Sequence, residues 1–285
     1  MGRGVSRVTD VVLTGVPRSG TTLTCALLNK LPDTVALHEQ MQGMDHGDPA
    51  DSRDVSGRVE QFFDEQRASL LTSGRALSRN IDGVVPDNPF GDELSAKGVR
   101  RQLDTQGEIV VDKELAADFT LVIKHTHLFA WMLESLVGTF PIYAIVRNPL
   151  ATVASWRSVS TRIRSGHSPA ERAVPELKAK IERLDDDLDR QLCLLGWFWD
   201  QFTRHLPERS IIRYEDLIAT NGRALSVIQP AAERLDEPLE NRNSNRLYDP
   251  TEMAQIGERL VKSDGAYWTW YPKESVGAFL NALDR

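Results

Sequence analysis

A glycine-bounded loop near the N-terminus constrains the fold of this chain more than any other feature. Asp10 to Thr14 form a short apolar run typical of a buried strand, Gly15 to Gly20 follow, and a helix is expected over Thr21 to Lys30. Two glycines with this spacing, between a strand and a helix, indicate a loop whose backbone N–H groups surround phosphate oxygens. The alternative, a tight strand-to-helix turn without a ligand, is less favoured.

Apolar runs predict further buried strands along the chain. They are Thr34 to Leu37, Ile109 to Val111, Phe119 to Lys124, Pro141 to Val146 and Ser210 to Tyr214. Helical stretches such as His127 to Val137 and Pro149 to Val159 alternate with them, and a long helical region is expected over Pro169 to His205. This alternation predicts an α/β, three-layer fold with a mostly parallel central sheet flanked by helices.

The segment from Met41 to Gly107 has more loop-forming residues and fewer apolar runs than the rest of the chain. Loop-forming stretches at 43–49 and 86–91 flank a helix expected over Val55 to Leu71. The segment has too few apolar residues for a convincing second core. We therefore expect residues 1–285 to form a single domain with a variable insertion around 41–107, placed over the mouth of the active site.

Composition excludes several classes of protein. With 285 residues, 41% of them hydrophobic, the chain can bury one large core. Its net charge of −7 disfavours a protein that coats nucleic acid or anionic membranes. The longest apolar run, Leu192 to Trp199, is too short for a membrane span, the N-terminus lacks a signal peptide, and two cysteines favour a reducing compartment. We expect a cytoplasmic protein; the sequence carries no signal for an oligomeric state.

The loop departs from that of an ATP or GTP enzyme where the phosphate-binding lysine should stand. Thr21 occupies that position, and Arg18 supplies the cation of the loop instead. The strand ending at Val146 leads into Arg147, where a nucleotide triphosphatase often has an aspartate that supports Mg²⁺. Both departures indicate a ligand with a phosphate on the loop and a second anionic group near Arg147, and no metal.

These motifs resemble the sulfotransferase family, whose members share a P-loop-like α/β fold. Their donor, 3′-phosphoadenosine 5′-phosphosulfate (PAPS), carries anionic groups at two ends. The family's 3′-phosphate element, an arginine followed eight positions later by a serine, is matched by Arg147 and Ser155, and the segment Ile212 to Leu217 is similar to one near that phosphate. The loop is most similar to that of the tyrosylprotein sulfotransferases. That branch also has an arginine twelve positions after Arg147, where this chain has Val159.

The resemblance implies two sets of donor-binding residues, which release adenosine 3′,5′-bisphosphate as product. Those for the 5′-phosphosulfate are Pro17, Arg18, Ser19, Gly20, Thr21 and Thr22. Those for the 3′-phosphate are Arg147, Ser155 and Tyr214. Arg18 is also expected to stabilise charge on the leaving phosphate.

Catalytic roles follow from the same resemblance. Lys124, at the end of an apolar strand, is expected to contact the sulfuryl group. Glu39 aligns with the base of the tyrosylprotein branch, whereas the hormone-type branch uses a strand-end histidine, for which His125 and His127 are the candidates. We favour Glu39 and leave the histidines open, since strand alternation places both on the face opposite the lysine.

The sequence thus predicts a PAPS-dependent sulfotransferase that acts on a hydroxyl, or as the less favoured choice an amine, of a small-molecule acceptor. One alternative is a small-molecule P-loop kinase with Arg18 in place of the usual lysine. Another is a non-catalytic nucleotide-binding protein that retains the phosphate loop and has lost the base. The acceptor itself is not named by any motif, because the insertion and the C-terminal loops that should bind it carry none.

Overall fold

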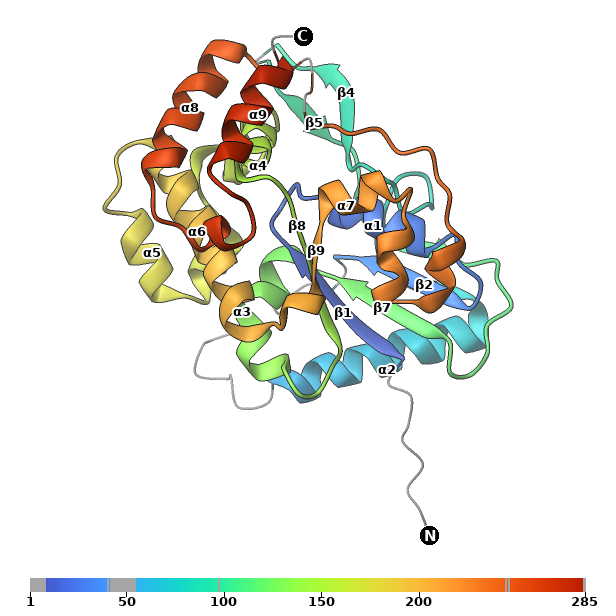
Figure 1. Ribbon diagram of the computed structural model, residues 1–285. Coiled ribbons are helices and arrows are strands. Elements are labelled where there is room, and N and C mark those ends of the chain that lie inside the picture. The colour runs from blue at the N-terminus through green and yellow to red at the C-terminus, as the bar shows by residue number, and fades with distance from the viewer. Residues whose placement is uncertain are drawn as a thin grey trace.

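The computed structural model describes residues 9–39, 41, 55–96, 98–243, 245 and 247–283, and a five-stranded sheet forms its centre (Figure 1). The strands are β1 (Asp10–Gly15), β2 (Thr34–His38), β7 (Thr120–Lys124), β8 (Ile142–Val146) and β9 (Ile211–Arg213). Their order is β2-β7-β1-β8-β9, and every neighbouring pair is parallel. Five of the predicted strands and the parallel sheet are therefore confirmed.

The central strands are continuous apolar runs because both faces of the sheet are covered. Val12 pairs with Ile123 of β7 on one side and with Ile142 of β8 on the other, and all three side chains are buried. Such strands lack polar alternation, since neither face meets water. The sheet therefore forms the rigid core on which the loops at its carboxyl edge are mounted.

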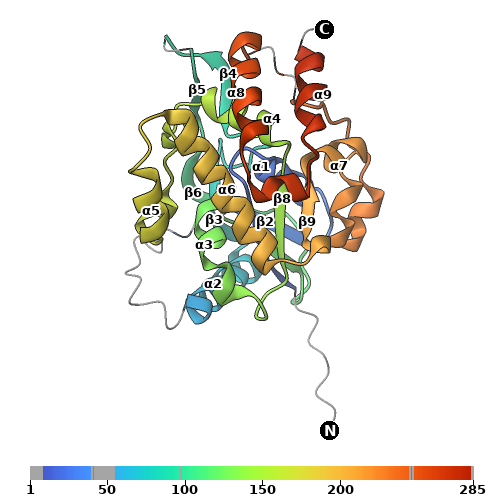
Figure 2. The same ribbon diagram turned by 60° about the vertical axis from the view of Figure 1, so that its left-hand side comes forward.

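A group of helices lies beside the β8 and β9 side of the sheet (Figure 2). It comprises α4 (Pro149–Arg157), α5 (Pro175–Ile181), α6 (Asp187–His205), α8 (Pro250–Lys262) and α9 (Glu274–Leu283). Short 3₁₀ turns connect the larger elements at Arg162–Ser165, Pro169–Arg172, Glu208–Ser210, Arg223–Val227, Pro230–Arg234 and Ala266–Thr269. Within the described ranges, no helix combines the length and the apolar character needed to cross a bilayer.

The prediction of one long helical region over Pro169 to His205 is wrong in its continuity. A 3₁₀ turn, α5 and α6 occupy that region with breaks between them. Asp186 causes the last break, because its carboxylate accepts hydrogen bonds from the N–H groups of Leu188 and Asp189 and so starts a new helix. A side chain that caps a helix start competes with continuing the helix before it.

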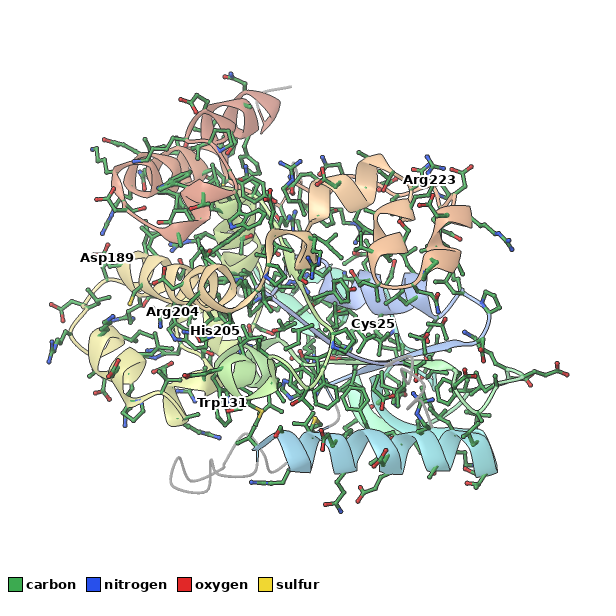
Figure 3. The ribbon with its side chains drawn as sticks, turned by 60° about the horizontal axis from the view of Figure 1, so that its bottom comes forward. Cys25, Trp131, Asp189, Arg204, His205 and Arg223 are labelled. Carbon is green, nitrogen blue, oxygen red and sulfur yellow. The ribbon has the colours of Figure 1, made fainter. Side chains whose placement is uncertain are left out.

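Helices on both faces give the chain its three layers. Figure 3 shows α2 (Val55–Ser73, light blue) and α3 (Thr126–Leu136, green) on one side of the sheet, and α1 (Thr21–Leu28, blue) on the other with the segment that begins at α7 (Tyr214–Ala219, orange). The predicted three-layer α/β architecture and the helix after the glycine loop are confirmed. The helix predicted at 55–71 is also present, as α2.

Two small antiparallel sheets follow α2 in the segment predicted as an insertion. One pairs β3 (Arg75–Asn80) with β6 (Thr105–Val110), and the other pairs β4 (Phe90–Leu94) with β5 (Arg100–Gln102). The prediction of a buried strand at Ile109 to Val111 in the parallel sheet is therefore wrong. Ile109 is buried, but its neighbours Glu108 and Val110 are exposed, as in a strand with one covered face. The loop predicted at 43–49 lies outside the described residues.

Candidate functional site

Each of the five central strands ends beside one cavity. The loop after β1 carries Arg18, β2 leads into Glu39, β7 ends at Lys124, β8 leads into Arg147, and β9 leads into Tyr214. All five residues line a cavity of about 600 Å³. They come together because parallel strands present their carboxyl ends at the same edge of a sheet, where α/β proteins bind ligands. That volume is suited to a small molecule or nucleotide.

The loop after β1 needs its glycines for two different reasons. Gly15 has no room for a side chain, since a Cβ there would lie 2.3 Å from the Ile145 carbonyl oxygen. Gly20 has φ of +97°, and a Cβ there would lie 2.8 Å from Cδ2 of Tyr214. Arg18 adopts a left-handed φ of 70° without being glycine, so its backbone is strained at the cavity wall.

Side-chain hydrogen bonds fix this loop to the elements around it. Oγ of Ser19 donates to the Ile145 carbonyl at 2.6 Å, and Nε1 of Trp156 donates to the Pro17 carbonyl at 2.7 Å. The Ser19 side chain is therefore directed into the sheet, whereas Pro17, Gly20, Thr21 and Thr22 line the cavity. Thr21 begins α1, whose first N–H groups have no acceptor within the helix and remain available for an anion.

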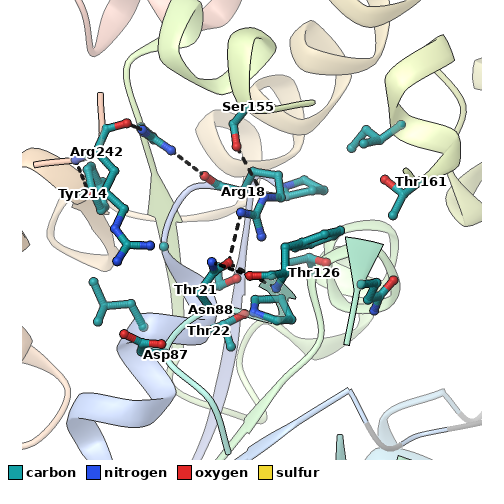
Figure 4. Close-up of a pocket in the computed structure, with 18 of the residues that line it drawn as sticks. Arg18, Thr21, Thr22, Asp87, Asn88, Thr126, Ser155, Thr161, Tyr214 and Arg242 are labelled. Atoms are coloured by element: carbon teal, nitrogen blue, oxygen red, sulfur yellow. Dashed lines mark hydrogen bonds between the residues drawn. The ribbon is translucent and has the colours of Figure 1, made fainter. Parts of the chain in front are cut away.

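The guanidinium of Arg18 reaches across the cavity. Its Nε donates to Oγ of Ser155 at 3.3 Å, and its Nη2 donates to Oδ1 of Asn88 at 3.3 Å (Figure 4). Cζ lies 4.3 Å from the ring centroid of Phe90. In the described part of the chain no carboxylate pairs with Arg18. Burial and the nearby Arg100 guanidinium lower its pKa to about 9, so it stays protonated at neutral pH.

Arg147 joins the end of β8 to the glycine loop. Its Nη1 donates to the Arg18 carbonyl at 3.2 Å, while Nε and Nη2 donate to Oδ1 of Asn243 and the Arg242 carbonyl, at 2.6 and 2.5 Å. The guanidinium also lies 4.7 Å from the centroid of the Tyr214 ring. Because all these acceptors are uncharged, the positive charge of Arg147 is held in place without being neutralised.

Ser155 enters the site through helix α4. Asn148 starts this helix by accepting hydrogen bonds from the N–H groups of Leu150 and Ala151, and Pro149 occupies its first turn. The N–H of Asn148 in turn donates to Oε1 of Glu215 at 3.0 Å. These contacts fix the helix start at the end of β8, which carries Ser155 to the cavity wall near Arg147.

Glu39 and Lys124 form an ion pair on the other side of the cavity. Nζ of Lys124 lies 2.6 Å from Oε1 of Glu39, and Oγ1 of Thr126 donates to the same oxygen at 3.1 Å. The N–H of Glu39 donates to the Lys124 carbonyl at 2.8 Å, and its φ of 43° is left-handed. Backbone and side chain are thus both fixed by β7, which aims the carboxylate into the cavity.

His38 also lines the cavity, although no sequence motif predicted it. It pairs with Lys124 in the β2–β7 register, and its Nε2 lies 2.9 Å from Nζ of Lys124. Its adjacency to Glu39 was the only available signal, because the register itself cannot be read from the sequence. Burial, followed by the charge of Lys124, lowers the pKa of His38, so the imidazole is neutral and accepts from the ammonium.

The charge state of Glu39 is set by two opposing effects. Burial alone would raise the pKa of this carboxyl, but the Lys124 ammonium outweighs burial and holds the pKa well below its usual value. Glu39 is therefore ionised at neutral pH, the form that a general base requires.

The two histidines after Lys124 are separated by the start of α3. His125 is the N-cap of this helix, where its side chain accepts from the Leu128 N–H, and it is not among the described residues that line the cavity. His127 does line the cavity, with Nδ1 2.8 Å from Oγ of Ser168, and burial lowers its pKa to about 4. The expectation that both histidines face away from the site is wrong for His127, because strand alternation stops where the helix begins.

The insertion contributes residues to the cavity wall that no sequence motif predicted. Asn88 and Phe90 contact Arg18, and Arg100 and Asp104 line the wall nearby. The side chain of Asp104 has 0% exposure and pairs with Arg79, whose Nε lies 2.8 Å from Oδ2. Among the residues described, no three His, Cys, Asp or Glu side chains gather closely enough to form a metal site.

A family model matches most of the chain. Residues 8–240 match the family model described as a Sulfotransferase domain. Sulfotransferase STF1 from Mycobacterium tuberculosis H37Rv is 13% identical, with 89% of this chain and 76% of that chain covered and a TM-score of 0.36. Sulfotransferase STF9 from Mycobacterium avium is 14% identical, with 97% and 75% covered and a TM-score of 0.31. No curated protein matches the chain. Since the family match spans well over half of the 285 residues, the chain belongs to the sulfotransferase family.

Proposed function

We propose that this sulfotransferase takes its sulfuryl group from PAPS and transfers it to a hydroxyl of a small-molecule acceptor. One observation carries the proposal: Arg18 and Arg147 come from different strand ends, line one cavity and are joined by a hydrogen bond of 3.2 Å to the Arg18 carbonyl. Neither guanidinium is paired with a carboxylate among the described residues, so a ligand that binds both must carry negative charge. PAPS meets this requirement, since it carries anionic groups at two ends.

The residues present fit this donor. We assign the 5′-phosphosulfate to residues 17–22, because the strained glycine loop and the first N–H groups of α1 are suited to binding an anion. We assign the 3′-phosphate to Arg147, Ser155 and Tyr214. When bound, the donor supplies an electrophilic sulfur with a stable phosphate leaving group. Arg18 can stabilise the charge on that phosphate, because no carboxylate of the described residues neutralises it.

Glu39 and Lys124 are proposed to act on the acceptor side. The ionised Glu39 carboxylate can accept the proton of a hydroxyl placed beside it, and Lys124 can stabilise negative charge nearby. Lys124 also keeps Glu39 a weak base while the cavity is empty. A negative charge brought next to Lys124 would offset this effect and make the carboxylate more basic. The site therefore favours proton removal only when it is filled.

The acceptor is proposed to lie between Glu39 and the insertion. Polar groups of the described insertion residues line this part of the wall, among them Asn88, Gln102 and Asp104. Thr161 and His167 complete it from the segment after α4. We propose that the chain is one domain in which the 41–107 insertion determines which small molecule is accepted.

Titration calorimetry tests the donor assignment. We expect adenosine 3′,5′-bisphosphate to bind at least about tenfold more tightly than ATP, with no dependence on Mg²⁺, and Arg18→Gln or Arg147→Gln to weaken it by about tenfold or more. Arg204→Gln, an exposed position on α6, is the control. Tighter, Mg²⁺-dependent binding of ATP would support a kinase instead. Binding of the bisphosphate without turnover on a broad acceptor panel would support a non-catalytic nucleotide-binding protein.

A further inference from the structure

Arg100 is a buried cation to which the proposed donor site gives no role. It begins β5 in the insertion, lines the cavity and is 3% exposed. Its Nη2 donates to Oγ of Ser158 at 2.9 Å, whereas its buried Nε has no hydrogen-bond acceptor in the described part of the chain. Nor does any carboxylate of the described residues pair with it. A buried, unneutralised guanidinium is costly unless a ligand supplies the missing charge.

The backbone places Arg100 against the end of α4. Its N–H donates to the Ser158 carbonyl at 2.9 Å, and its carbonyl accepts from the Ser160 N–H at 3.1 Å, so that Arg100 and Val159 form a bridge between the two segments. Oγ of Ser158 donates in turn to the Ser155 carbonyl at 2.8 Å. The guanidinium therefore lies about one helical turn from Ser155. The insertion thus places the Arg100 guanidinium next to the segment that contains the uncharged Val159.

Other cations surround the same part of the cavity. Arg18, Arg147 and Arg242 line it. The charges of Arg147 and Arg242 act against the protonated form of Arg100, whereas Tyr248 and Asp92 favour it. Burial and these cations lower the pKa of Arg100. Four guanidinium groups line this one cavity, and together they favour a ligand with more than one negative charge.

We propose that Arg100 binds the 3′-phosphate of the donor together with Arg147 and Ser155, so that the insertion supplies part of the donor site. This inference rests on the proposed function. It makes Arg100 a specificity residue: the enzyme distinguishes nucleotides that carry a 3′-phosphate from those that lack it partly through a side chain outside the motifs. It also ties donor binding to the β4–β5 hairpin, since Gln102 of β5 and the nearby Asp104 line the same cavity.

The test is titration calorimetry with two nucleotides, adenosine 3′,5′-bisphosphate and adenosine 5′-monophosphate. In the wild type, the bisphosphate should bind more tightly. Arg100→Gln should weaken the bisphosphate by about tenfold or more and the monophosphate by less than about threefold, because only the former places a phosphate at this end. Arg101→Gln is the matched control, since Arg101 is the next residue of β5 and is exposed. It should change neither affinity.

Three outcomes would overturn the inference or its basis, and they can be told apart. Equal weakening of both nucleotides by Arg100→Gln would place Arg100 at the 5′ end, and no weakening would make it structural; either result refutes the inference alone. A wild type that does not prefer the bisphosphate would instead refute the proposed function. If Arg100→Gln fails to fold, Arg100→Lys decides: it keeps the charge without the planar fork and should still reduce the bisphosphate preference.

Discussion

Replacing Glu39 by glutamine removes the charge of the proposed base with little change of shape. Oε1 of Glu39 accepts from Lys124 at 2.6 Å and from Thr126 at 3.1 Å, and a glutamine carbonyl oxygen can keep both hydrogen bonds. The variant loses the ability to take a proton. A general base contributes about 10²- to 10⁴-fold to rate, which corresponds to roughly 3 to 5 kcal/mol of activation free energy. We expect kcat to fall by that factor.

The assay combines turnover with donor binding. Initial rates give kcat for wild type, Glu39→Gln and the control Glu134→Gln, which changes an exposed carboxylate on α3. Calorimetry with adenosine 3′,5′-bisphosphate should give dissociation constants within about threefold of one another, because Glu39 belongs to the acceptor side. A Glu39→Gln enzyme with near-normal kcat would refute the assignment of Glu39 and favour His127. A large loss of nucleotide affinity would show that Glu39 acts on the donor.

Three further predictions concern stability, each measured by urea unfolding. Gly20→Ala should lower the unfolding free energy by about 1 to 3 kcal/mol, because its Cβ would lie 2.8 Å from Tyr214 Cδ2 at φ +97°; an unchanged midpoint would contradict the loop geometry. Ser19→Ala should cost about 1 to 3 kcal/mol by leaving the buried Ile145 carbonyl without its 2.6 Å partner; no loss would mean that water replaces it. His127 has a folded pKa of about 4, below its unfolded value, so the unfolded chain takes up the proton first and the protein becomes less stable as the pH is lowered. Between about pH 7 and about pH 5, wild type should lose about 2 kcal/mol more unfolding free energy than His127→Asn. Parallel curves for the two proteins would contradict the burial of that imidazole.

The strands and the glycine loop could be predicted from the sequence because their signals are local. Five of the predicted apolar runs form the parallel sheet. Gly15 and Gly20 occupy positions where a Cβ would clash with neighbouring atoms. The run at 109–111 failed because a short apolar stretch does not say which strand it pairs with; only the β3–β6 register settles that. The break before α6 had a local signal in Asp186, whose capping role competes with the helical pattern around it.

The residues of the site also fall into a group that the sequence could predict and a group that it could not. Arg18, Arg147 and Ser155 stand in motifs that can be read along the chain, and all three line the cavity. His38 and Arg100 could not be predicted, because each depends on contact between distant segments. His38 approaches Lys124 through strand pairing, and Arg100 approaches Ser158 through a bridge formed by the insertion. Sequence spacing carries no information on such contacts.

A crystal structure of the complex with adenosine 3′,5′-bisphosphate would test the central claim most directly. The account predicts one nucleotide in the cavity, with its 5′-phosphate about 3 Å from the N–H groups of residues 20–22 and its 3′-phosphate on Arg147 and Ser155. A nucleotide bound in the reverse orientation, or outside the cavity, would contradict it.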